Sequence, residues 1–83
     1  MKKPCFVTLK HADGNRGDLL LNLAFACQIT VSPRPAIAGT PEASAGWHIS
    51  MVSVVWDGGD SHEHLVRTSP EETMRGIAAA LHQ

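Results

Sequence analysis

The sequence LLLNLAFACQITV, residues 19–31, places an apolar side chain at every second position from Leu19 to Val31. Successive side chains of an extended strand point to opposite faces, so this period of two predicts a long strand with one buried face. A helix is the alternative, because Leu and Ala favour helices, but it would be apolar nearly all round and would need a larger protein around it. The stretch is also too short to span a bilayer. We interpret residues 18–32 as one strand.

The length and charge of the chain restrict its function. Its 83 residues predict a single domain, 1–83, with a small core. The formal net charge is −1, and Lys and Arg are scattered along the chain. Duplex nucleic acid and anionic membranes are bound by clustered cations, so we expect neither as a partner. The apolar stretch after Lys2 and Lys3 is too short for an export signal, and we therefore expect a cytoplasmic protein.

A second strand is predicted over residues 4–11, where apolar side chains again alternate with others. Between the two strands, residues 15–17 suit a three-residue hairpin turn with Gly17 in the left-handed conformation. That turn predicts three cross-strand pairs, namely Leu9 with Leu23, Val7 with Phe25, and Cys5 with Cys27. We expect the two cysteines to be buried neighbours that remain thiols, because their spacing is not Cys-x-x-Cys and the expected compartment is reducing.

The second half of the chain predicts a further hairpin. Residues 33–46 contain three prolines and two glycines and predict a long mobile loop, which is either a binding segment or a connector. Residues 47–56 are apolar on both faces, as in a central strand. Gly58 and Gly59 suit a two-residue turn into a strand over residues 61–67. This turn places Val55 opposite His62.

A helix is predicted over residues 70–82. Ser69 is a good N-cap, Pro70 suits the first helical position, and Glu72 completes a capping box. The residues after it form an apolar stripe at helical spacing, made of Met74, Ile77, Ala78 and Leu81. We expect this stripe to pack on the sheet.

Together these elements predict an α+β fold, in which an antiparallel sheet of about four strands, a meander of two hairpins, carries one C-terminal α-helix on one face. One helix covers one face, whereas strand 47–56 is apolar on both. The second face is therefore expected to be covered by a second copy, by a partner protein, or by the loop over residues 33–46.

No residue pattern predicts catalysis. His62 and His64 would point to the same side of a strand and could share a metal ion, but no third ligand is evident, so we expect no metal site. The sequence contains no Gly-x-Ser-x-Gly elbow and no phosphate-binding glycine loop. We therefore expect no catalytic residues, no cofactor and no enzyme activity.

The sequence favours a small protein–protein interaction module, which binds another protein or itself as a homodimer. The candidate partner-binding residues are the exposed aromatic, basic and imidazole side chains Phe6, Arg34, Trp47, Trp56, His62, His64 and Arg67. The alternative is a protein associated with single-stranded nucleic acid, with Trp and Phe stacked on bases. The dispersed cations make nucleic acid the weaker choice.

Residues 65–81 lead from a strand through Ser-Pro-Glu-Glu into a short helix rich in Ala and Leu. This arrangement is similar to the ends of many small bacterial and phage proteins. In size and style the chain is similar to small phage proteins that inhibit host defence enzymes, such as anti-CRISPR proteins. The similarity implies a stoichiometric inhibitor of a host enzyme complex that acts by binding.

Overall fold

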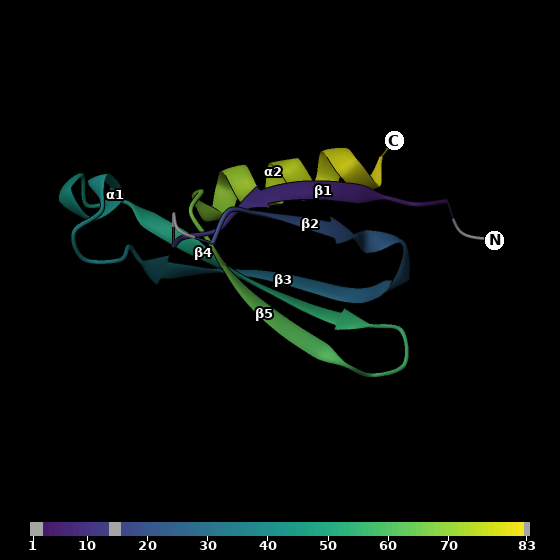
Figure 1. Cartoon of the computed structure of the whole chain (residues 1–83). Coiled ribbons are helices and arrows are strands. Elements are labelled where there is room, and N and C mark those ends of the chain that lie inside the picture. The colour runs from purple at the N-terminus through teal and green to yellow at the C-terminus, as the bar shows by residue number, and fades with distance from the viewer. Residues whose placement is uncertain (1–2, 14–15, 83) are drawn as a thin grey trace.

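The computed structural model describes residues 3–13 and 16–82, which fold into two antiparallel sheets and a C-terminal helix (Figure 1). The first sheet pairs β1 with β2, and the second has the order β3-β4-β5. The elements are β1 (Phe6–Lys10), β2 (Asp18–Asn22), the 3-10 turn η1 (Leu23–Phe25), β3 (Ala26–Pro35), α1 (Pro41–Ser44), β4 (His48–Trp56), β5 (Ser61–Val66) and α2 (Pro70–Leu81). The predicted α+β class with a C-terminal helix is confirmed.

The alternating stretch forms two strands, and the prediction of one continuous strand over residues 18–32 was wrong. The 3-10 turn η1 separates β2 from β3 and carries the chain from one sheet to the other. Asn22 stabilises this break, because its Oδ1 accepts hydrogen bonds from the N–H of Ala24 at 3.1 Å and of Cys5 at 3.0 Å. A turn this short leaves the alternation nearly intact, so the sequence pattern did not reveal it.

The first hairpin forms in a different register from the predicted one. Leu9 lies opposite Leu19 and Val7 opposite Leu21, a shift of four residues that keeps the same side chains facing inward. Cys5 and Cys27 are therefore not cross-strand neighbours. Cys27 is exposed, and Cys5 is half-buried with its Sγ–H donating to the carbonyl of Ala80 at 3.0 Å. Both are free thiols in this structure, and the prediction that both cysteines are buried was wrong for Cys27.

Residues 33–46 contain more regular structure than the predicted loop. Residues 33–35 extend β3 and pair with residues 48–50 of β4. Proline is compatible with this position because β3 lies at the edge of its sheet, where a nitrogen without hydrogen can face away from the neighbouring strand. Further along, Thr40 caps the short helix α1, with its Oγ1 accepting from the N–H of Ala43 at 3.3 Å.

The second hairpin is one residue out of its predicted register. The N–H of Trp56 donates to the carbonyl of Asp60 at 2.7 Å, which closes a three-residue turn, residues 57–59, instead of a two-residue one. His62 therefore lies opposite Val54, and His64 lies opposite Val52. Both histidines share the face of the sheet that carries the core.

The core lies between the two sheets and α2. Val52, Val54 and Val66 are fully buried, and Val7, Leu9, Leu21 and Leu23 close the core from the first sheet. The helix α2 lies against β1, β3 and β4 (Figure 1). Its N-cap is Ser69, as predicted. The buried face of α2 consists of Thr73, Ile77 and Ala80, whereas Met74 and Leu81 of the predicted stripe are exposed.

Backbone hydrogen bonds join the end of β1 to the end of β5. The N–H of Ala12 donates to Leu65 O at 3.0 Å, and the N–H of Arg67 donates to Lys10 O at 2.9 Å. These bonds link the two sheets at one corner. They also bring Lys10 beside Arg67, although 57 residues separate the two in the sequence.

Candidate functional site: the surface around Trp47

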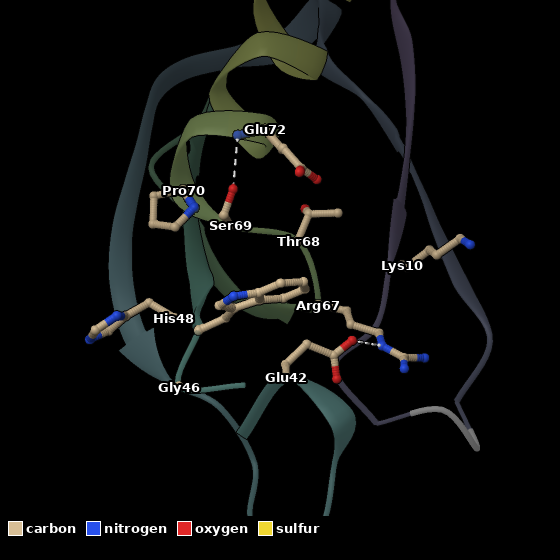
Figure 2. Close-up of a pocket in the computed structure, with 10 residues that line it drawn as sticks. Lys10, Glu42, Gly46, His48, Arg67, Thr68, Ser69, Pro70 and Glu72 are labelled. Atoms are coloured by element: carbon tan, nitrogen blue, oxygen red, sulfur yellow. Dashed lines mark hydrogen bonds and ion pairs between the residues drawn. The ribbon is translucent and has the colours of Figure 1, made fainter. Parts of the chain in front are cut away.

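A hollow of about 640 Å³ lies where α1, the start of β4 and the start of α2 meet (Figure 2). It combines an aromatic side chain with basic and acidic ones. We call it the Trp47 surface, and its lining residues are Lys10, Glu42, Gly46, Trp47, His48, Arg67, Thr68, Ser69, Pro70 and Glu72. Three separate stretches of the chain contribute to it, namely residue 10, residues 42–48 and residues 67–72, so only the folded protein contains the surface.

The end of α1 positions Trp47. Gly46 follows this helix with a φ of 75°, a left-handed conformation that commonly ends helices and that glycine adopts without strain. The N–H of Trp47 then donates to the carbonyl of Glu42 at 2.9 Å. These contacts hold the backbone of Trp47 in place. The residue as a whole is nevertheless 67% exposed. An indole with this much exposed apolar surface is a candidate binding feature.

An ion pair between Arg67 and Glu42 also lines the hollow. The Nε of Arg67 donates to Oε1 of Glu42 at 2.6 Å, which joins α1 to the segment after β5 (Figure 2). The hydrogen bond from the Arg67 guanidinium is the main reason that the pKa of Glu42 lies below its usual value. Both side chains remain partly accessible, so the pair could exchange this contact for one with a bound molecule.

The charges of the Trp47 surface balance. Lys10 and Arg67 contribute two positive charges, and Glu42 and Glu72 contribute two negative ones. At the start of α2 the backbone N–H of Glu72 is already hydrogen-bonded, since it donates to Ser69 Oγ at 3.3 Å. The surface therefore offers an apolar platform with polar groups of both signs, which suits a polar and apolar protein surface better than a polyanion.

The other predicted partner-binding residues lie elsewhere. Trp56 and His62 contact each other, with Nε1 of Trp56 donating to Nδ1 of His62 at 3.1 Å. Phe6 is 53% exposed on β1. The Nη1 of Arg34 donates to the carbonyl of Pro33 at 3.1 Å on the edge strand β3. Of the seven predicted residues, only Trp47 and Arg67 line the Trp47 surface. Glu42 was missed, because no local sequence pattern connects it to Arg67.

Three histidines lie near one another at the junction of β1 and β5. His11 forms an isolated bridge with Val66. Val66 lies two residues after His64 on β5, and His62 lies two residues before it on the same strand. Partial burial lowers the pKa of His64, and the positive charges that His11 and His62 can carry lower it further. Among residues 3–13 and 16–82, no group of three or more His, Cys, Asp or Glu side chains is arranged to hold a metal ion.

Comparisons with known proteins add no relatives to this description. No protein-family model matches the chain, and no curated protein or solved structure with significant similarity was found. Within the described part of the chain, none of the helices has the length and apolar character needed to cross a membrane.

Proposed function

We propose that this chain is a non-enzymatic interaction module that binds another protein through the Trp47 surface. The observation that carries the proposal is the exposure of Trp47, which is 67% exposed. It lines a hollow of about 640 Å³ together with the Arg67–Glu42 ion pair. Trp and Arg are the residue types that most often dominate the binding energy of protein interfaces. Hydrogen bonds already fix the backbone on both sides of the hollow, so little conformational entropy is lost on binding.

A module of this kind acts by binding its partner in a fixed stoichiometry. Such binding is suited to blocking or bridging a larger complex. The similarity in size and style to phage inhibitors of host enzymes supports a blocking role. Under this proposal the partner presents an apolar side chain to Trp47 and a carboxylate or carbonyl to Arg67.

The second candidate function is binding of single-stranded nucleic acid. Lys10 and Arg67 lie beside Trp47 in the same hollow, an arrangement in which a base could stack and a phosphate could pair. Glu42 and Glu72 oppose this use, because they cancel the positive charge that a phosphate backbone requires.

The test is affinity purification of the tagged protein from its native host. We expect a reproducible partner that is lost with Trp47→Ala and with Arg67→Glu. The matched control is Leu20→Ser, which changes another large exposed side chain, 65% exposed on β2. A partner retained equally by all variants would contradict docking at the Trp47 surface. Salt-dependent binding of a fluorescent oligothymidine that is lost with Trp47→Ala would instead favour the nucleic-acid function.

A further inference from the structure

The outer edge of β3 presents backbone hydrogen-bonding groups that pair with no other strand in the described residues. The strand runs from Ala26 to Pro35 and pairs with β4 on one side only. No backbone hydrogen bond joins residues 28–35 to any element other than β4. An edge strand with free N–H and C=O groups is a template for pairing with another strand.

The two prolines show which residues of β3 face outward. A proline has no N–H, so Pro33 and Pro35 cannot exchange hydrogen bonds with their partners on β4. In an antiparallel pair the residues that exchange hydrogen bonds alternate with those whose N–H and C=O point away. Positions of the same parity as Pro33 therefore point outward. The register between Gln28 and Pro35 is regular, so Ile29 and Val31 direct their N–H and C=O groups to the free edge.

We propose that two copies of this chain pair along β3, antiparallel and centred on Thr30, to form one continuous six-stranded sheet. In this register Ile29 of each copy exchanges two hydrogen bonds with Val31 of the other copy, four in all. Both outward-facing residues then have all their backbone groups satisfied. Centring the pair on Val31 would place Ile29 opposite Pro33, which has no N–H to donate. Centring it on Ile29 would require Cys27, the extra residue at the irregularity in β3.

The side chains and charges of β3 are compatible with this pairing. The sequence contains no charged residue from Leu19 to Pro33, so no like charges meet at the centre of the proposed interface. Arg34 of each copy would lie opposite Ala26 of the other, which keeps the two guanidinium groups far apart. Thr30 is exposed and would lie directly opposite Thr30 of the other copy. Edge strands are commonly protected by Lys or by prolines. Here the prolines lie outside the central residues, at one end of β3.

This inference does not depend on the proposed function, because the Trp47 surface and the β3 edge use different residues. It predicts a monomer–dimer equilibrium in sedimentation velocity that shifts toward dimer as concentration rises. Thr30→Lys places two ammonium groups opposite each other and should weaken the dimer roughly fivefold or more. Ser53→Lys, on the adjacent strand β4 and directly opposite Thr30, is the control and should leave the dimer unchanged.

Disulfide trapping tests the register. In a Cys27→Ser background, Thr30→Cys should give a covalent dimer on mild oxidation, because a pair of this type has its Cα atoms about 4.5 Å apart, within the disulfide range. Ser32→Cys is the matched control, since its two thiols would sit about four residues apart along the strands, roughly 13 Å. Equal trapping of both variants would overturn the register. A native chain that sediments as a monomer at all concentrations, or a dimer unaffected by Thr30→Lys, would overturn the interface.

Discussion

The hydroxyl of Thr73 on α2 donates a 3.1 Å hydrogen bond to the hydroxyl of Ser50 on β4. Ser50 in turn donates to the carbonyl of Thr68 at 2.8 Å, and the hydroxyls of Thr68 and Thr73 lie 2.6 Å apart. Ser50 and Thr73 are almost completely buried. Buried hydroxyls are costly unless they are paired, so this closed network fixes the position of α2 on the sheet.

Thr73→Val should lower the free energy of unfolding by about 1–3 kcal/mol. The substitution keeps the shape of the side chain but removes the hydrogen bonds that the Thr73 hydroxyl makes with the hydroxyls of Ser50 and Thr68. Urea unfolding followed by circular dichroism measures the change. Thr8→Val on the exposed side of β1 is the control and should change the same quantity by no more than about 0.5 kcal/mol. Equal effects at the two positions would show that the network does not stabilise the fold.

The orientation of α2 predicts a difference between two of its apolar residues. Ile77→Ala should cost about 2–4 kcal/mol of unfolding free energy, because Ile77 is 6% exposed and its removal leaves a cavity. Met74→Ala should cost less than about 0.5 kcal/mol, because Met74 is 57% exposed. Thermal unfolding of the two variants measures this difference. A loss at Met74→Ala as large as the loss at Ile77→Ala would contradict this orientation of α2.

The two cysteines should differ in their reaction with a thiol reagent. Cys27 is exposed and should react rapidly in the native protein, whereas Cys5 is half-buried and bonded to Ala80 O and should react slowly. Cys27→Ser should remove the fast phase and leave the slow one. Ellman's reagent, with and without denaturant, measures both rates. A native mass two hydrogens below that of the reduced chain would reveal a disulfide and contradict the prediction.

Acid should weaken the fold through His64. The pKa of His64 is lower in the folded chain than in the unfolded chain, mainly because of partial burial. As pH falls, the unfolded chain therefore takes up the proton first, and stability is lost progressively once pH drops below the ordinary histidine value of about 6.5. Above that pH the contribution is fully present. His64→Gln should show a smaller loss of unfolding free energy between pH 7.5 and pH 5.5.

His82→Gln is the control for this measurement, because His82 is exposed at the end of α2. It should retain the full acid sensitivity of the parent chain. If His64→Gln and the parent chain lose the same stability over that pH range, other groups cause the acid sensitivity.

Local sequence signals predicted much of the secondary structure. The cap at Ser69 and the proline after it fixed the start of α2, and the turn residues 57–60 joined two strands as expected. The registers were less predictable. The register of the second hairpin follows from the hydrogen bond between Trp56 N–H and Asp60 O, which depends on the pairing of whole strands.

The candidate site was predicted only in part. Trp47 and Arg67 were selected by residue type, which identifies side chains able to bind but not their neighbours. Their proximity arises because the N–H of Arg67 bonds to Lys10 O and its side chain bonds to Glu42, contacts across 57 and 25 residues. No local periodicity carries such information.

The sequence by itself determined the alternation that makes β2 and most of β3 extended, the capped helix at the C-terminus and the absence of charged residues from Leu19 to Pro33. These properties follow from side-chain chemistry and local backbone preferences. Only the tertiary structure decided that Asn22 divides the alternating stretch between two sheets, that Thr73 rather than Met74 faces the core, and that the edge of β3 remains without a partner strand in the described residues. Each of these depends on which long-range contacts satisfy buried polar groups, and that balance exists only in the folded chain.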